Sequence, residues 1–243
     1  MRCMSKRIVC LLLIFIALVS CTAKGKTYRV GVDPSWYPLN LAGKEANVFA
    51  FSNELLMAIS HEERICFESI RMNWDNLNWG LKEKKYEAIL SSMMPRVSLE
   101  NTYVFSDPFL HTGPVLVMGA KGKVNSMKGK EVAVDSMDQE VILIEHFPGV
   151  IVHYYDSIPV GLDQILSQEI DGILINYVQA ADFVRGLYHG KVKIVTPPLD
   201  ESGLRLITLT GENDELMKAF NRGLEKLREN GKLEKLLKKW ELN

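Results

Sequence analysis

Residues 28–59 read YRVGVDPSWYPLNLAGKEANVFAFSNELLMAI, and this stretch decides the fold class. Its first five residues are rich in branched and aromatic side chains, which is typical of a β-strand. Further along, Leu55, Leu56 and Ile59 recur at the spacing that places them on one face of a helix. A strand followed by an amphipathic helix is the unit from which α/β proteins are built.

The same alternation continues along the chain. Strand-like runs are expected at residues 28–32, 65–70, 88–90, 115–118, 131–134, 150–155, 172–175, 192–195 and 204–209. Segments of helical period lie between several of them. Near the end, residues 216–227 keep one face apolar, and Asn230-Gly231 predicts a left-handed stop before a second short helix. The whole pattern predicts sheets covered by helices, the α/β class.

The composition excludes several classes of function. Lys and Arg number 29 against 30 Asp and Glu, a net charge of −1, so the chain lacks the basic excess that binds nucleic acid. The five histidines show no paired ligand spacing, and no phosphate-binding glycine loop is present. We therefore expect no metal site and no cofactor. Cys66, flanked by Ile65 and Phe67, is interpreted as a small core residue rather than a nucleophile.

The N-terminus has the pattern of an export signal. Residues 1–7 carry basic side chains and no acid, and an apolar run follows at 8–19, too short to span a bilayer comfortably. Residues 18–21, LVSC, resemble the bacterial lipobox, which predicts a lipoprotein signal peptide at residues 1–20 and lipidation of Cys21. The acyl chains would anchor the protein to a membrane. The alternative is ordinary cleavage nearby, with Cys21 taking no part.

Seven short motifs occur in an order that resembles a known family. They are YRVGVDP at 28–34, FSNELLMAI at 51–59, KYEAILSSM at 85–93, FSDPF at 105–109, MKGKEVAV at 127–134, IDGILIN at 170–176 and the closing helices from Asp214 to Trp240. From Tyr28 to Trp240 the chain resembles the bacterial extracytoplasmic solute-binding proteins of the polar amino acid type, family three, which serve ABC importers.

This resemblance implies the two-lobed type II periplasmic-binding-protein fold, also called a Venus flytrap. Each lobe would be a mixed sheet flanked by helices, and two crossover strands would join the lobes. Lobe 1 is expected at residues 27–112 plus 205–243, and lobe 2 at 113–204. A small-molecule ligand would bind in the cleft between them, and closure of the lobes would present it to an ABC permease. The resemblance also implies a monomer in the periplasm or on the outer face of the membrane.

The two charged anchors of the family do not carry over. Amino acid binders use an arginine for the carboxylate of the ligand and an aspartate for its ammonium group. Counted without gaps, the arginine falls on Leu99 and the aspartate on Asn176. A threonine pair after the opening strand of the second lobe becomes Asp138 and Gln139. The sequence therefore leaves the identity of the ligand open.

Other cleft positions of the family are kept. Trp36 and Trp74 fall on aromatic positions that face the ligand, although a lone tryptophan is also a common core residue. Ser91 and Ser92 fall on the turn whose hydroxyl and amide groups meet the ligand. Met93, together with Met94 and Met137, would add an adaptable lining.

Two charged residues are candidates to replace the missing anchors. Arg96, three residues before Leu99, would reach an anionic group from a shifted position, or would simply be solvated after Pro95. Asp138 would meet a cationic group, or would only cap the helix that begins near Gln139.

Two further functions stay open at this stage. Some relatives of this fold have become dehydratases acting on small carboxylic acids, which would require a general acid or base such as Glu140, Asp138 or His111. A sensory surface lipoprotein would keep the fold without transport. We predict the binding function rather than an enzyme, because the spacing of these residues does not demand catalysis.

Overall fold

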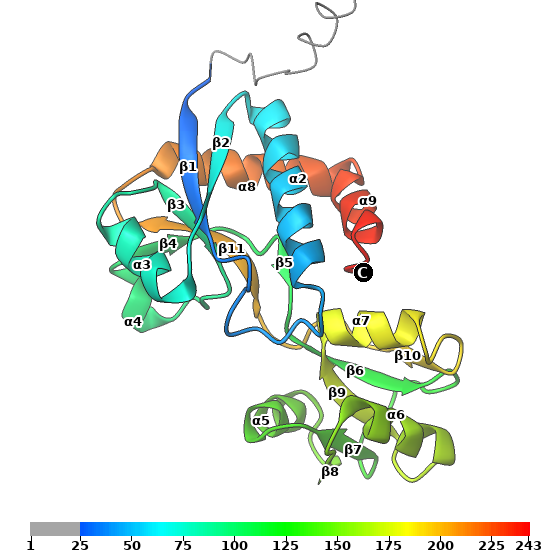
Figure 1. Ribbon diagram of the computed structural model, residues 1–243. Helices are drawn as coiled ribbons and strands as arrows, with labels where there is room; N and C mark the ends of the chain where they lie inside the picture. The colour runs from blue at the N-terminus through cyan, green and yellow to red at the C-terminus, as the bar shows by residue number, and fades with distance from the viewer. Residues whose placement is uncertain (1–24) are drawn as a thin grey trace, which may run out of the picture.

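The computed structural model describes residues 25–243. The predicted signal peptide at residues 1–20 and the lipidated Cys21 lie outside this range. Two β-sheets, each with its own helices, lie at opposite ends of the molecule (Figure 1). We call the first sheet with its helices lobe 1 and the second lobe 2.

Lobe 1 contains a six-stranded mixed sheet in the order β2-β1-β3-β11-β4, with β5 also paired to β11. Strands β1, β2 and β3 run parallel, and β11 runs antiparallel to its neighbours. The strands are β1 (Thr27–Val32), β2 (Cys66–Arg71), β3 (Ala88–Ser91), β4 (Tyr103–Phe105), β5 (Leu110–His111) and β11 (Gly203–Leu209). The last strand therefore enters the middle of a sheet that the first half of the chain begins.

Five helices accompany this sheet. They are α2 (Glu45–Glu63), α3 (Trp74–Lys82), α4 (Val97–Glu100), α8 (Asp214–Glu229) and α9 (Lys232–Lys239). One face of the sheet packs against α2 and α8, and the other packs near α3. Buried side chains of α8 follow the helical period predicted from residues 216–227.

Lobe 2 contains a five-stranded mixed sheet in the order β10-β6-β9-β7-β8. Its strands are β6 (Pro114–Gly119), β7 (Glu131–Val134), β8 (Ile151–Tyr154), β9 (Gly172–Asn176) and β10 (Val192–Ile194). Its helices are α5 (Met137–His146), α6 (Ile158–Ser167) and α7 (Tyr177–Arg185). Strand β9 leads directly into α7, which places Asn176 at the junction.

The α/β class and the two-lobed architecture are confirmed. Each strand expected from the sequence is present, but β4 and β5 were missed because they are only three and two residues long. One lobe boundary differs from the expected position. Gly203 and Leu204 pair with His111 and Leu110 in the sheet of lobe 1, so they do not belong to lobe 2.

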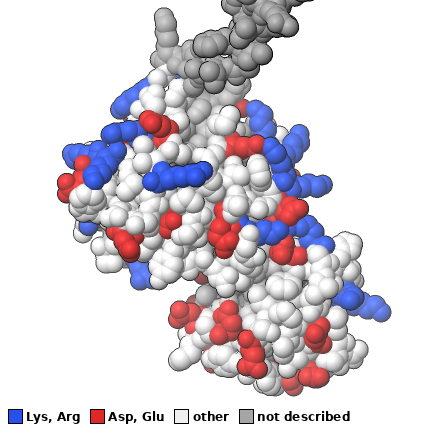
Figure 2. All heavy atoms as spheres, viewed as in Figure 1, with Lys and Arg blue, Asp and Glu red and all other residues white. Residues whose placement is uncertain are grey.

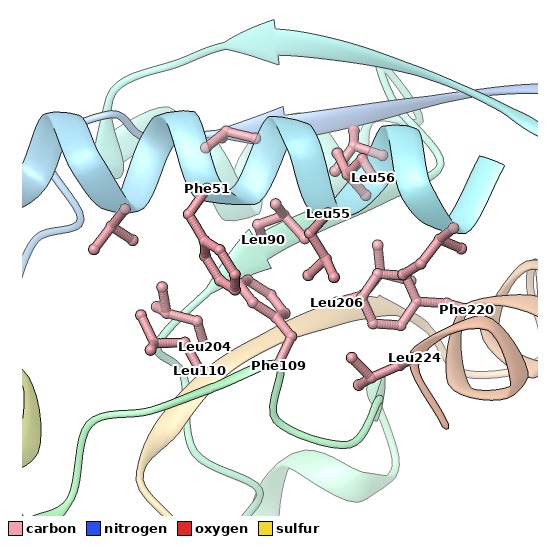
Figure 3. Packing of buried hydrophobic residues seen from close by; sticks show 14 of the residues in the cluster. Phe51, Leu55, Leu56, Leu90, Phe109, Leu110, Leu204, Leu206, Phe220 and Leu224 are labelled. Atoms are coloured by element: carbon pink, nitrogen blue, oxygen red, sulfur yellow. The ribbon is translucent and has the colours of Figure 1, made fainter. Parts of the chain in front are cut away.

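The core of lobe 1 joins elements from both ends of the chain. Phe109, which is 2% exposed, lies between Phe51 of α2 and Phe220 of α8 (Figure 3). Leu204 and Leu206 of β11 pack into the same cluster. Cys66 is 8% exposed, which agrees with its interpretation as a small core residue rather than a nucleophile.

Helix α7 of lobe 2 contacts lobe 1 directly. Lys44, just before α2, forms an ion pair of 2.9 Å with Asp182 of α7 and another of 2.9 Å with Glu241. Hydrogen bonds to these two carboxylates, Asp182 first, raise the pKa of Lys44. Arg185 donates to the backbone oxygens of Glu241 and Asn243 at 2.8 and 2.6 Å. These contacts fix one side of the junction between the lobes.

Candidate functional site

A cleft of about 340 Å³ opens where the two lobes meet. Both lobes and both crossover segments contribute to its wall. The lining residues are Leu39 from lobe 1; Thr112, Gly113, Asp200 and Ser202 from the crossovers; and Pro114, Asp135, Ser136, Asp138, Gln139, Ile142 and Asn176 from lobe 2. An inter-domain cleft of this size with several polar groups is typical of a site for a small molecule.

The lobe 2 wall is built on the N-terminus of α5. Ser136 caps this helix by accepting a hydrogen bond from the Gln139 amide at 3.4 Å. The interpretation of Asp138 as the cap is therefore wrong. Its side chain is exposed and lines the cleft in the first helical turn. A carboxylate at this position is available to a cationic group of a ligand.

Gln139 and Asn176 line the same wall but differ in burial and in whether the side chain is already hydrogen-bonded. Gln139 is buried, and its Oε1 accepts a hydrogen bond from the Asp135 amide at 3.3 Å. It therefore orders the loop that precedes α5. Asn176 is half-buried at the start of α7, and its side chain makes no capping bond with the described residues of that helix. Its amide remains able to face the cleft.

The aromatic positions of lobe 1 are arranged differently from the sequence prediction. Trp36 has a left-handed backbone with φ of 56°, and its ring is buried in the core with Nε1 donating to the Glu45 carbonyl at 3.2 Å. The neighbouring Tyr37 is 59% exposed instead. Its ring meets the half-buried Trp74 edge-on, with centroids 5.6 Å apart. The aromatic pair is thus formed by the exposed Tyr37 and the half-buried Trp74, without Trp36.

The turn after β3 leads toward the second crossover. Ser91 is buried and its Oγ accepts a hydrogen bond from the Met93 amide at 3.2 Å. Ser92 and Met93 are half-buried, and Met93 packs with Trp74 in the same cluster. The Met94 sulfur lies 3.4 Å from the Ser202 hydroxyl of the crossover. This contact connects the turn to the edge of the cleft.

Arg96 and Leu99 occupy the helix that follows this turn. Arg96 is exposed at the N-cap of α4, and only its backbone carbonyl has a hydrogen-bond partner among the described residues. Leu99 packs against the cluster that contains Trp74 and Met93. An apolar contact therefore exists at the position where the resemblance predicts the counterpart of the family's arginine.

One charged residue that binds the second crossover was not predicted from the sequence. Arg205 of β11 is only 6% exposed. Its Nη1 donates to the Ser106 carbonyl at 2.8 Å, and its Nη2 donates to the Glu201 carbonyl at 2.9 Å. The only signal in the sequence was a charged residue inside an otherwise apolar strand, LRLITL at 204–209.

The two crossovers lie in close contact at the cleft. Asp200 accepts hydrogen bonds from the amide and the hydroxyl of Ser202, both at 2.9 Å. Gly113 of the other crossover lies so close that a Cβ there would be 2.1 Å from the Asp200 carboxylate. The Gly113 carbonyl also accepts the Tyr177 amide at 3.0 Å, which connects this point to α7.

The residues considered for catalysis are not brought together. His111 lines a separate hollow of about 340 Å³ with Tyr177 and Arg228, where loss of hydration lowers its pKa. Glu140 accepts a hydrogen bond from Tyr154, and this bond raises the pKa of the Tyr154 phenol. Only Asp138 lines the cleft. In residues 25–243 no cluster of His, Cys, Asp and Glu has the arrangement of a metal site.

A larger hollow of about 840 Å³ lies at the far end of lobe 2. Its wall includes Lys121, Lys123, Lys130 and Lys191 with Glu131 and Asp171, and it is widely open to solvent. Lys130 donates a hydrogen bond to Asp171 at 2.7 Å. Desolvation by burial would raise the pKa of the Asp171 carboxyl, but this bond counters it and the pKa stays lowered. The hollow belongs to one lobe alone, so we place the site in the inter-lobe cleft instead.

Comparison with known proteins adds an independent finding. Residues 28–243 match the sequence profile of the bacterial extracellular solute-binding proteins, family 3. The chain is 24% identical to the L-cystine-binding protein TcyJ of Escherichia coli K12, over 88% of this chain and 82% of that protein. It is 26% identical to the histidine-binding periplasmic protein of the same strain, over 97% and 96% of the two chains.

A solved structure supports the architecture. The L-cystine solute receptor of Neisseria gonorrhoeae, in its unliganded open conformation, aligns with a TM-score of 0.69 and 21% identity. The alignment covers 90% of this chain and 94% of the receptor. At this identity the likeness establishes the fold alone.

Proposed function

Because this chain belongs to the bacterial extracellular solute-binding proteins of family 3, we propose that it captures an amino acid or an amino-acid-like solute and delivers it to an ABC permease. The observation that carries the proposal is a cleft lined by both lobes and by both crossovers. A solute that touches both walls binds the closed arrangement better than the open one, so it shifts the protein toward closure.

We assign the walls of the cleft to different parts of such a solute. Tyr37 and Trp74 replace the predicted pair of Trp36 and Trp74 as the aromatic surface, because Trp36 is buried. We assign the Ser91–Ser92 turn to the same wall, because Met93 of this turn packs in the same cluster as Trp74. On lobe 2, Asp138 would meet an ammonium group and Asn176 would supply an amide. The visible part of lobe 2 in Figure 2 carries mainly acidic side chains, which favours a ligand with a positive group.

Closure should be measurable with purified protein. When a solute that binds is added at 100 times its Kd, we expect a smaller radius of gyration by X-ray scattering. The free energy of unfolding should rise by about 2.7 kcal/mol at the same concentration, since the solute binds only the folded state. Deletion of the gene should abolish uptake of that solute. A bound solute that leaves both the radius and the uptake unchanged would contradict the proposal.

We also propose that the protein is held at a membrane through Cys21, outside the cytoplasm and as a monomer. No helix within residues 25–243 has the length and apolar character needed to cross a membrane. The lipobox-like sequence at residues 18–21 and the family, whose members are extracellular, support an anchor at the N-terminus.

Replacement of Cys21 by serine should release the protein from membranes. The thioether to the lipid requires the sulfur atom of this residue, so the variant is expected in the soluble fraction or as an unprocessed precursor. Fractionation followed by intact-mass measurement of the product tests this. A Cys21→Ser protein that is processed and still sediments with membranes would refute the anchor. Ser20→Ala is the matched control, which should stay lipidated because alanine is also small.

A further inference from the structure

Arg205 has an unusual position for a charged residue. It lies in a strand whose neighbours Leu204 and Leu206 are buried in the core of lobe 1. Because side chains alternate along a strand, Arg205 points to the opposite face with Ile207. Leu99 and Met93 pack on that same face. The guanidinium thus lies on the side of the sheet where the family's arginine is missing.

The position of Arg205 along the strand brings it to the cleft end of the sheet. Its Cα lies opposite Ser91, the last residue of β3, in the antiparallel ladder. Its Nη2 binds the backbone oxygen of Glu201, and the next residue, Ser202, lines the cleft. Arg205 therefore lies beside the last residue of β3 and is bound to the second crossover at the residue before Ser202.

The guanidinium is incompletely satisfied. Burying a charged donor without a partner is costly, so each orphaned donor requires an explanation. The Nε of Arg205 is buried and has no hydrogen-bond partner among residues 25–243. On the adjoining Nη2, one oxygen of the Glu201 carboxylate lies 3.3 Å away. Nε and Nη2 form the edge on which a carboxylate accepts two parallel bonds.

Glu201 occupies this edge weakly. It makes a single contact with Nη2, and its side chain is 81% exposed. Arg205 is buried in this pair while Glu201 is hydrated, so only the guanidinium would lose a charged partner if the Glu201 side chain turned into solvent. A free carboxylate in place of Glu201 would restore this charged partner and would bind both Nε and Nη2.

We propose that Arg205 is the anchor for a carboxylate of the ligand, and that Glu201 occupies the anchor when no ligand is bound. This inference rests on the proposed function, and it narrows the ligand to solutes that carry a carboxylate. It also replaces Arg96, which is exposed on α4, as the carboxylate partner. The anchor would thus come from the second crossover strand rather than from the helix after the serine turn.

The test compares each amino acid with the amine that remains when its carboxylate is removed. The twenty common amino acids and L-cystine are first screened by thermal shift, together with carboxylate-free amines and sugars. The tightest amino acid and its amine, for example L-histidine with histamine or L-cystine with cystamine, are then titrated by calorimetry. In the wild type the amino acid should bind roughly 10- to 100-fold more tightly than the amine.

Two variants and one control test the role of Arg205. Arg205→Lys should reduce the ratio of the two affinities toward one, because a point charge cannot make the two parallel bonds. Glu201→Gln, at an exposed side chain, should tighten binding of the amino acid about two- to fivefold and leave the amine unchanged. Arg29→Lys, on β1 and paired with Glu87, should leave the ratio as in the wild type. The ratio is informative because a purely structural role of Arg205 would weaken both probes equally.

The possible failures are distinguishable. An unchanged ratio in Arg205→Lys together with an unchanged affinity in Glu201→Gln overturns the inference. Binding and uptake of a solute without a carboxylate also overturns it, while the proposed transport function stands. If no solute binds and deletion of the gene affects no uptake, the proposed function falls as well.

Discussion

Replacing Phe109 by alanine is expected to lower the free energy of unfolding of lobe 1 by about 3–5 kcal/mol. The ring is 2% exposed, and its centroid lies 6.2 Å from that of Phe51 and 6.3 Å from that of Phe220. It is the point at which α2, α8 and the segment before the crossover meet, as Figure 3 shows. Removal of the ring leaves a cavity that these three rigid elements cannot close.

The measurement is denaturant unfolding of the purified variant, followed by circular dichroism. Met57→Ala provides the control, since Met57 lies on the same helix as Phe51 and is 70% exposed. Its effect should remain within about 0.5 kcal/mol. A cost below about 1.5 kcal/mol for Phe109→Ala would mean that the core of lobe 1 rearranges around the gap.

The second large effect is expected at Gly113, where the crossovers touch. A Cβ at this position would lie 2.1 Å from the Asp200 carboxylate, which is already held by two hydrogen bonds from Ser202. In Gly113→Ala the crossovers must separate or the Asp200 turn must break. We expect a loss of stability of about 1–3 kcal/mol, as for other overpacked sites, and weaker binding of any solute that requires closure.

Gly119→Ala is the matched control, on the same strand β6 that follows Gly113. A Cβ there meets only the Ile165 side chain, at an ordinary distance of 3.6 Å. Thermal unfolding, a binding titration and scattering should therefore separate the two variants clearly. If Gly113→Ala binds and closes like Gly119→Ala, the contact between the crossovers does not control the motion.

Much of the fold was predictable from local pattern. Strands such as β1 and helices such as α8 bury one face, so apolar residues recur in their sequences at the period of the strand or helix. The motifs at FSDPF and IDGILIN gave the architecture through resemblance alone. Strands β4 and β5 were missed because two or three residues carry no period, and only pairing with β11 makes them strands.

The candidate site was predicted less completely, because the direction in which each side chain points matters there more than the residue type. Trp36 and Tyr37 are adjacent aromatics, and only the left-handed backbone at Trp36 decides which ring is buried. The sequence allows two roles for Asp138, and the structure excludes the role of cap because Ser136 takes it. The site assignments themselves, including Asn176 and the serine turn, stay predictions.

The position of Arg205 depends on tertiary structure rather than on a local sequence pattern. A single arginine between apolar residues gives no local signal, and its neighbours Ser106 and Glu201 come together only in the folded sheet. Counted without gaps, the family's arginine falls on Leu99, and Arg96 is the nearest arginine on the same stretch of chain. The structure places a guanidinium on the same face of the sheet from a residue more than a hundred positions away.

The place of β11 in the sheet also sets the order in which the protein becomes complete during synthesis. This strand lies between β3 and β4, yet the whole of lobe 2 is translated before it. Lobe 2 is continuous in the chain, so it can fold as soon as it has emerged. Lobe 1 cannot be completed at that point, because the edges of β3 and β4 that pair with β11 have no partner yet. A chain that has emerged only as far as lobe 2 therefore leaves strand edges of lobe 1 unpaired until residue 209 is available, and in this interval aggregation and chaperone binding compete with folding.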